Sequence, residues 1–425
     1  MTALDTAVTK NRYRLVPFML ALYVLAFLDR SNIGFAKEAY QLDTGLSNEA
    51  YALGAGIFFV LYAALGMPAN LIMYRWGAKK WIGTTTVLWG LLSASMAFAD
   101  TEVKFLLVRT LLGAVEAGFF PGMIYLTSLW FPRDKRAGIM GLFYMGAPLA
   151  LTFGSPLSGA LLEMHGFLGH PGWYWMFMIE GLMAVVAGLF TFLWLVDTPD
   201  KAGFLTRDEK QALKAQLDSE RRDAATGSIR EAVRTPRIWH LAIIYMTIQI
   251  AVYGLIFFLP TQVAALMGSK VGFTASLVAA IPWVAALVGT WYIPRLSDRL
   301  GERRNIAAVT LLAAGVGIGV SGLVSPLVAM VALCVAAAGF IAVQPVFWTM
   351  PTQLLSGTAL AAGIGFVNLF GAVGGFLAPM IRVHADEFFS SQTAGLLTLA
   401  AIAILGAGLI LALKRSSAAA PAVPA

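Results

Sequence analysis

The nine residues Phe27–Phe35 read FLDRSNIGF and lie at the end of an apolar run that begins at Val16. Asp29, Arg30 and Asn32 therefore stand where the interior of a membrane helix is normally apolar. A charged side chain at the centre of a spanning helix costs at least ~2.5 kcal/mol on insertion scales, and such residues usually mark a functional site. The stretch predicts a membrane helix that carries a pathway for an ion or a substrate.

The composition of the whole chain supports a membrane protein with many spans. Hydrophobic residues make up 59% of the 425 residues and charged residues 12%, whereas soluble domains carry about 25% charged residues. Twelve long apolar segments follow one another, each near the roughly 20 residues that cross a bilayer as a helix. They cover residues 16–36, 51–74, 81–99, 105–131, 137–162, 173–196, 238–267, 273–294, 305–323, 326–350, 358–381 and 393–413.

One polar region divides these segments into two groups of six. Residues 197–237 hold 17 of the 53 charged residues, and the part LTRDEKQALKAQLDSERR has the composition of a solvated linker helix. We therefore predict an all-α membrane protein of twelve transmembrane helices in two six-helix bundles with pseudo-two-fold symmetry. The expected division is an N-terminal tail 1–15, a first bundle 16–196, a linker 197–237, a second bundle 238–413 and a C-terminal tail 414–425.

The lysines and arginines predict the orientation of the chain in the membrane. With an even number of spans, 24 of the 30 basic residues fall on the side of the two termini and the linker, and 4 fall on the other side. Basic loops stay on the cytoplasmic side, so we expect both termini and the linker in the cytoplasm.

The two halves also resemble each other. YRWGAKK (residues 74–80) follows the second span and SDRLGERR (residues 297–304) follows the eighth, and the fifth and eleventh spans are both interrupted by Gly and Pro. Such matched interruptions point to a transporter built from repeats. Close packing of helices through glycine explains them as well.

Few ionisable residues lie deep in the predicted spans. Arg30 is the expected anion anchor, because a guanidinium binds a carboxylate through two parallel hydrogen bonds; a structural ion pair is the alternative. Asp29 is a candidate for proton binding or gating. Glu116 is a candidate proton carrier, because a dry environment favours the protonated form of a carboxylic acid. Arg109 lies seven residues earlier on the same helix face, and Glu180 is expected to be structural.

The spans of the second half carry uncharged polar groups instead. Amides and an indole suit the hydroxyl groups and the carbon skeleton of a polyhydroxylated ligand, although each of these residues could also serve packing alone. The candidates are Gln249, Tyr253, Gln344, Trp348 and Asn368. The pattern predicts that the first half handles charge and protons and that the second half recognises the ligand body.

Four stretches together resemble the anion:cation symporter family of the major facilitator superfamily: FLDRSNIGFA, GMPANLIMYRWGAKKW, RTLLGAVEAGFFPGMIYLTSLWFP and VFWTMPTQLLSG. The resemblance implies alternating access around a central cavity, with Arg30 on the substrate carboxylate and Asp29 and Glu116 as coupled proton sites. It also implies that Tyr62, Gln249, Trp348 and Asn368 line the cavity and that the protein lies in a bacterial inner membrane. From the residues themselves we expect Asn32, Arg109, Tyr253 and Gln344 to support the site. Phe27 and Tyr74 depart from the pattern, since family members can carry tyrosine at the first position and often carry aspartate at the second.

The expected function is proton-coupled import of a hydroxylated monocarboxylate, a sugar acid such as L-rhamnonate or a related aldonate. The alternatives are symport of another organic anion, tartrate-like or aromatic, and an antiporter or exporter of the same fold. We expect no enzymatic activity, no cofactor or metal and no nucleic acid partner, and we expect each chain to act as a monomer. Its partners are then the organic anion, protons and the lipid bilayer.

Overall fold

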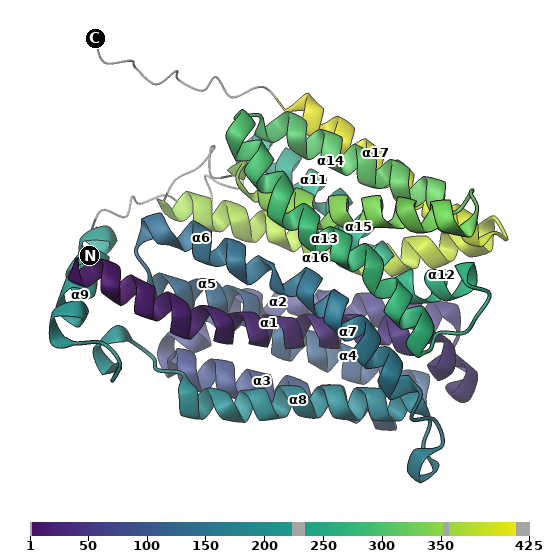
Figure 1. The fold of residues 1–425 in the computed structure, drawn as a ribbon, viewed down its shortest axis with the longest axis horizontal. Coiled ribbons are helices and arrows are strands. Elements are labelled where there is room, and N and C mark those ends of the chain that lie inside the picture. Colours follow the sequence, from purple (N-terminus) through teal and green to yellow (C-terminus); the bar gives the residue numbers. More distant parts are fainter. Residues whose placement is uncertain (1, 223–233, 352–356, 414–425) are drawn as a thin grey trace.

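The computed structural model describes residues 2–222, 234–351 and 357–413, and all regular elements in these ranges are helices (Figure 1). The first half contains α1 (Ala3–Thr44), α2 (Asn48–Trp76), α3 (Ala78–Ser95), α4 (Glu102–Glu116), α5 (Phe119–Trp130), α6 (Arg133–Tyr144), α7 (Gly146–Leu162) and α8 (Gly172–Trp194). The second half contains α11 (Pro236–Ile256), α12 (Leu259–Leu266), α13 (Phe273–Leu300), α14 (Arg303–Ser321), α15 (Pro326–Trp348), α16 (Gly357–Phe388) and α17 (Gln392–Ala412). The predicted C-terminal tail 414–425 lies outside the described residues.

Eleven helical stretches of the described chain are long and apolar enough to cross a membrane. The fourth predicted span is divided between α4 and α5, which are separated by Ala117 and Gly118, both with helical backbone angles. The two short helices together fill the place of the remaining span, so the chain has the predicted all-helical architecture. The segment predicted as the N-terminal tail 1–15 is helical, because α1 begins at Ala3 with Thr2 as its N-cap and Asp5 in a reciprocal capping box.

Successive spans alternate in direction, which gives the molecule two faces. We call the face that holds Ala3, Trp194 and Ala412 the terminal face, and the face that holds Thr44, Asn48 and Phe388 the opposite face. The helices of the first half lie together below those of the second half in Figure 1. The halves meet where α2 packs on α16 and α7 packs on α13.

The contacts that join the halves gather near the opposite face. The Tyr51 hydroxyl donates to the carbonyl oxygen of Phe257 at 3.3 Å, and the backbone N–H of Val271 donates to Glu38 at 3.3 Å. α1 approaches the same carbonyl at Gly34, where an added Cβ would lie 2.9 Å from the Phe257 oxygen. The halves are therefore tightly apposed beside the opposite face.

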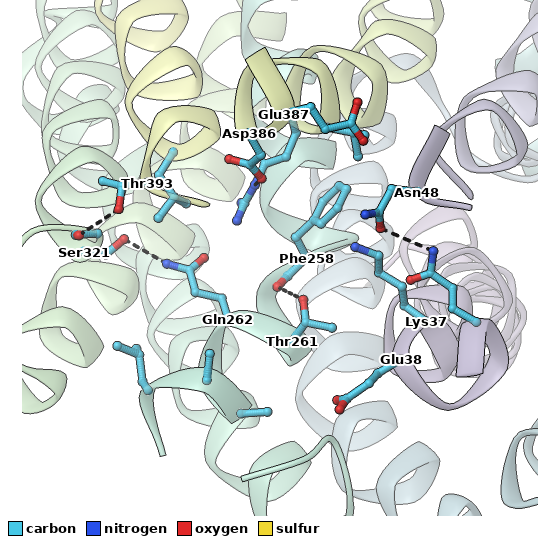
Figure 2. A pocket seen from close by; sticks show the side chains of 18 of the residues that line it. Lys37, Glu38, Asn48, Phe258, Thr261, Gln262, Ser321, Asp386, Glu387 and Thr393 are labelled. Carbon is cyan, nitrogen blue, oxygen red and sulfur yellow. Dashed lines mark hydrogen bonds and ion pairs between the residues drawn. The ribbon is translucent and has the colours of Figure 1, made fainter. Parts of the chain in front are cut away.

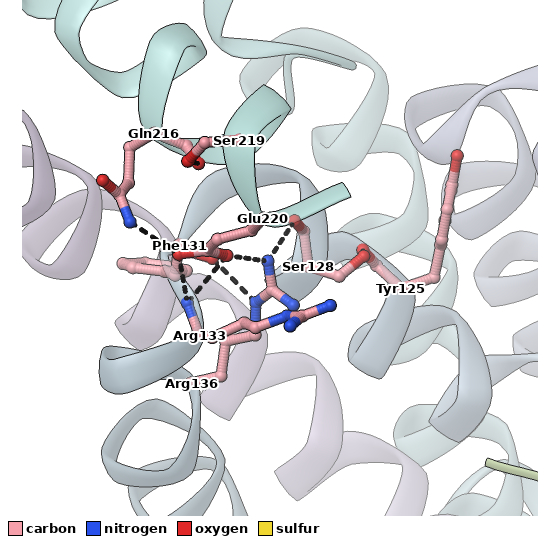
Figure 3. Close-up of polar contacts among 8 residues, drawn as sticks. All are labelled: Tyr125, Ser128, Phe131, Arg133, Arg136, Gln216, Ser219 and Glu220. Atoms are coloured by element: carbon pink, nitrogen blue, oxygen red, sulfur yellow. Dashed lines mark hydrogen bonds and ion pairs between the residues drawn. The ribbon is translucent and has the colours of Figure 1, made fainter. Parts of the chain in front are cut away.

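The linker contains a helix that packs against the first bundle, unlike the solvated helix that its composition predicts. α9 (Arg207–Arg222) buries Leu213 and Leu217. Figure 3 shows its last turn, where both carboxylate oxygens of Glu220 accept the Arg133 backbone N–H at 3.1 Å and one accepts from Arg136 Nη2 at 3.3 Å. The charged composition of the linker thus hides an apolar stripe on one face of a helix.

The start of α9 is held by a second acidic residue. Lys10 Nζ donates to the Glu209 carboxylate at 2.8 Å, and the backbone N–H of Thr206 donates to it at 2.8 Å. These hydrogen bonds lower the pKa of Glu209 from its ordinary value. The carboxylate therefore stays charged, and this end of α9 stays attached to α1, until the pH falls through the lowered pKa.

Replacing Glu220 by Gln should loosen the linker helix from the first bundle. The substitution keeps the side-chain shape but removes the charge that accepts from Arg133 and Arg136. We expect faster tryptic cleavage in α9 with little change in overall stability, since a partly exposed ion pair contributes only about 0–1 kcal/mol. Asp134→Asn is the matched control, because the Lys135–Asp134 pair is exposed. Equal cleavage of Glu220→Gln and wild type would contradict the docking role.

A second prediction concerns the helix that carries Arg109 and Glu116. α4 approaches α2 at Gly113, where an added Cβ would lie 2.0 Å from the carbonyl oxygen of Phe58. Gly113→Ala should therefore separate the two helices and destabilise the fold by about 1–3 kcal/mol, measured as a lower Tm in detergent. At Gly138 an added Cβ meets nothing within 4 Å, so Gly138→Ala should leave the Tm unchanged or raise it. A Gly113→Ala variant as stable as Gly138→Ala would refute the close approach.

Candidate substrate and proton site

A small cavity lies at the centre of the molecule, between the two halves. Six of the predicted residues line it: Arg30, Tyr62, Gln249, Tyr253, Gln344 and Asn368. They come from α1, α2, α11, α15 and α16. Residues more than 300 positions apart in the sequence thus meet around one space, with the charged group on the side of the first half and the amides on the side of the second.

The cavity has a volume of about 60 Å³. That space corresponds to about two water molecules of liquid volume, whereas pockets for small organic ligands measure roughly 300–1,000 Å³. A ligand with the size of a sugar acid therefore requires the halves to move apart at this level.

The central charged contact is an ion pair between Arg30 and Glu116. Arg30 Nε and Nη2 lie 3.1 and 2.8 Å from Glu116 Oε2. The residues are 6% and 0% exposed, respectively, so water contributes little screening. Glu116 Oε1 has no hydrogen-bond partner among the described residues. One oxygen thus takes both donors, while the other is open to a proton or to another donor.

Aromatic rings surround the Arg30 guanidinium. Its Cζ lies 4.9 Å from the ring centroid of Tyr62, 5.2 Å from that of Phe58 and 5.6 Å from that of Phe27. Cations are attracted to ring faces at these distances. The rings hold the guanidinium at the edge of the cavity without occupying its hydrogen-bond donors.

Asp29 and Arg109 lie behind this pair, away from the cavity lining. Arg109 Nε donates to the carbonyl oxygen of Gly54 at 3.1 Å, which ties α4 to α2. Asp29 interacts electrostatically with Glu116, Arg109 and Arg30, and its Oδ2 has no hydrogen-bond partner in the described part of the chain. The two carboxyl groups and the two guanidinium groups therefore form one buried cluster of zero formal charge.

Glu180 belongs to a neighbouring polar contact in the same bundle. Ser158 Oγ donates to Glu180 Oε1 at 2.6 Å, which joins α7 to α8. Asn32 interacts electrostatically with Glu180, although the Asn32 Nδ2 atom has no hydrogen-bond partner among the described residues. Asn32 thus faces α7 and α8 rather than the central cavity, and it supports the site through the position of α1.

Trp348 lies one layer behind the cavity wall. Its ring is 4.7 Å from that of Tyr245 in an edge-to-face arrangement, and Tyr245 lines the cavity. The indole N–H of Trp348 has no hydrogen-bond partner among the described residues. In this conformation Trp348 positions Tyr245 instead of facing a ligand.

Sequence reasoning missed three tyrosines that line the cavity, Tyr23, Tyr144 and Tyr245. Each lies in an apolar span, which is the same signal that identified Tyr253. Family members can carry tyrosine at the position of Phe27. In this chain the ring of Tyr23 meets that of Phe27 edge-to-face, with the centroids 5.3 Å apart. Tyr23, one helical turn before Phe27, thus supplies a tyrosine to this part of the cavity wall, and Phe27 lines the cavity beside it.

Comparison with known proteins is consistent with this architecture. The family model of the Major Facilitator Superfamily matches residues 19–379. The chain is 75% identical over 411 residues to the inner membrane transport protein RhmT of Escherichia coli, covering 97% of this chain and 96% of that protein. It is 39% identical to a protein of Agrobacterium vitis assigned as a tartrate transporter, covering 96% and 91% of the two chains.

A solved structure shares the fold at low sequence identity. The crystal structure of a bacterial homologue of the human lysosomal transporter Spinster, in an inward-facing and occupied conformation, superposes with a TM-score of 0.76 at 18% identity, covering 94% of this chain and 96% of that chain. These proteins are transporters and not enzymes. The chain is a multi-pass membrane transporter that belongs to the Major Facilitator Superfamily.

Proposed function

We propose that this protein imports a hydroxylated monocarboxylate together with protons. The observation that carries the proposal is the Arg30–Glu116 ion pair at the edge of a cavity lined by amides and tyrosines. Arg30 is the group that would bind the carboxylate of the substrate. In the conformation described here its Nε and Nη2 atoms donate to a carboxylate of the protein itself.

This competition couples substrate to protons. A proton on Glu116 removes the negative charge that holds Arg30, so Arg30 becomes available to the substrate carboxylate. Deprotonation of Glu116 restores the ion pair and displaces the substrate. The cluster of Asp29, Arg30, Arg109 and Glu116 is neutral when all four are charged, so one bound monoanion and one proton together preserve its neutrality. Asp29 is the second proton site, since it interacts with Glu116 behind the pair.

The lining from the second half supports a hydroxylated substrate. Gln249, Gln344 and Asn368 offer both donors and acceptors, and the Gln249 Oε1 atom is buried without a hydrogen-bond partner in the described residues. Tyr62 and Tyr253 offer hydroxyl groups beside Arg30. A carboxylate at Arg30 would therefore place a chain of hydroxyl groups towards the amides.

The relatives suggest which anion this is. The RhmT protein and the tartrate transporter are both similar over nearly the whole chain. We propose L-rhamnonate or a related aldonate as the substrate, with a tartrate-like or aromatic acid as the alternative. An exporter of cations is disfavoured by the two buried arginines, because a cation would meet like charge at the site.

The location follows from the charge distribution. The sequence assigns 24 of the 30 basic residues to the side of the two termini and the linker, so we propose that the terminal face is cytoplasmic and, from the relatives, that the protein lies in the bacterial inner membrane. Each chain encloses its own central cavity, so a monomer suffices for transport.

Uptake of radiolabelled L-rhamnonate into proteoliposomes tests the proposal. An inward proton gradient should stimulate uptake into wild-type vesicles. Arg30→Gln should reduce uptake by at least about 100-fold, because loss of a charged hydrogen-bond partner in a buried site costs about 3–5 kcal/mol. Arg30→Lys keeps the charge but loses the fork and should recover only part of it.

Glu116→Gln separates coupling from binding. It mimics the protonated state, so it should bind substrate and exchange it across the membrane but not respond to the proton gradient. Glu163→Gln is a control carboxylate outside the cavity, which accepts the Phe273 backbone N–H. Gradient-driven uptake by Glu116→Gln at the wild-type level would assign Glu116 a structural role. Competition by tartrate or an aromatic acid, but not by aldonates, would replace the named substrate.

A further inference from the structure

A second and larger cavity opens near the opposite face. It has a volume of about 580 Å³ and is lined by parts of α1, α12, α14 and α16 together with the first residues of α2 and α17 (Figure 2). We call it the vestibule. It lies beyond the tight apposition of the two halves, because Phe258 lines the vestibule whereas Tyr253, five residues earlier, lines the central cavity.

Two cations of the membrane-spanning helices meet in the vestibule, and the proposed transport step uses neither. Lys37 Nζ lies 4.7 Å from the ring centroid of Phe258, and Arg382 Cζ lies 4.9 Å from the same centroid. Lys37 comes from the first half and Arg382 from the second. Two cations beside one ring repel each other, so an anion between them would be stabilised by both.

Arg382 has unused donors that are buried. It is 5% exposed, and its Nε and Nη1 atoms have no hydrogen-bond partner among the described residues. Asp386 Oδ2 is 3.7 Å from Nε, which is too far for a hydrogen bond. Asp386 therefore balances part of the Arg382 charge through an ion pair but satisfies neither donor. Buried donors without hydrogen bonds are costly, so these two indicate a site for an acceptor from outside the protein.

The acidic residues of the vestibule are engaged within the protein or lie at its exposed rim, and Asp386 Oδ2 forms an ion pair with Arg382 Nε at 3.7 Å. Glu38 accepts the Val271 backbone N–H at 3.3 Å, and Asp386 Oδ1 accepts the Gly395 backbone N–H at 2.8 Å. Glu387 is exposed. The titratable groups that face the space are therefore the two cations and these three carboxylates, of which the two less exposed ones already accept from the backbone.

The vestibule also offers an acceptor for a hydroxyl group. Gln262 Nε2 donates to Ser321 at 3.1 Å, while Gln262 Oε1 is buried without a hydrogen-bond partner in the described part of the chain. A ligand that satisfies both unused groups carries a carboxylate for Arg382 and a hydroxyl donor for Gln262. That chemistry is the chemistry of a hydroxy acid.

We propose that the vestibule is a second binding site for the hydroxylated monocarboxylate, held by Lys37 and Arg382 before it reaches the central cavity. This inference rests on the proposed function for the identity of the ligand. The site is separate from Arg30, with the Phe257–Phe258 segment between the two, so the two sites can be disabled independently.

Cysteine labelling tests the vestibule without relying on transport. The chain has a single cysteine, Cys334, so Thr261→Cys in a Cys334→Ala background places one reactive thiol on the vestibule wall. The purified protein is reconstituted in nanodiscs, where both faces are accessible. We measure the rate at which this thiol is labelled by two thiosulfonate reagents, one with an anionic sulfonate group and one with a cationic trimethylammonium group. The measurement is then repeated with L-rhamnonate present.

The measured quantity is the labelling rate of the anionic reagent divided by that of the cationic reagent. We expect this ratio to be about tenfold higher in the protein with both cations than in the variant without them, which is the lower end of electrostatic effects on association rates. L-Rhamnonate should slow labelling. Lys37→Gln combined with Arg382→Gln should abolish both effects, whereas the control Arg295→Gln, which removes an exposed charge near the terminal face, should abolish neither.

Arg30→Gln distinguishes the vestibule from the central site. Protection that persists in Arg30→Gln supports a separate site, even if transport of L-rhamnonate proves absent and the proposed function fails. Protection lost in Arg30→Gln would overturn the inference, because the ligand would then act through the central cavity. Equal reagent preference in wild type and in the double variant, or an absence of protection, would overturn it as well.

Discussion

The buried Arg30–Glu116 ion pair is the constraint around which the site is arranged. Removing two charges from water costs several kcal/mol per ion. The attraction within a buried pair offsets this cost only when the remaining donors and acceptors of both side chains also form hydrogen bonds. Here it is met in part: Glu116 Oε1 and Asp29 Oδ2 lack hydrogen-bond partners among the described residues, while Glu116 Oε2 takes two donors from Arg30. Acceptors without hydrogen bonds are expected in a site whose protonation and binding partners change during a transport cycle. A purely structural ion pair would be expected to have them satisfied.

The surrounding packing explains why the pair can form. Arg30 comes from α1 and Glu116 from α4. α4 packs on α2, which contributes Phe58 and Tyr62 beside the Arg30 guanidinium. The absence of a side chain at Gly113 lets α4 lie against the Phe58 carbonyl. Arg109 then anchors α4 through the Gly54 carbonyl. The position of Glu116 therefore depends on backbone contacts with α2 as much as on its own charge.

The sequence was sufficient for the architecture and for most of the lining, because bilayer thickness imposes span length and because charge in a span is costly enough to stand out. Six predicted polar residues line the cavity. The pairing was not predictable: Asp29 is the sequence neighbour of Arg30, yet Glu116 is its partner, since helix rotation and packing decide which side chains face each other. Trp348, expected in the cavity lining, lies behind Tyr245 for the same reason. The docking of α9 could not be predicted from its charged composition. Only the spacing of Leu213 and Leu217, which places both on one helix face, indicates it.

The two cavities place a physical limit on how a ligand passes. The central cavity of about 60 Å³ is too small for a sugar acid, whereas the vestibule of about 580 Å³ is large enough. Between them lie the Tyr51 hydrogen bond to the Phe257 carbonyl and the approach of Gly34 to the same atom. Both contacts join the first half to one carbonyl of the second, so a relative rotation of the halves would break them together. Passage from the vestibule to Arg30 therefore requires the segment between α11 and α12 to separate from α1 and α2, and the same movement would enlarge the space beside the Arg30–Glu116 pair.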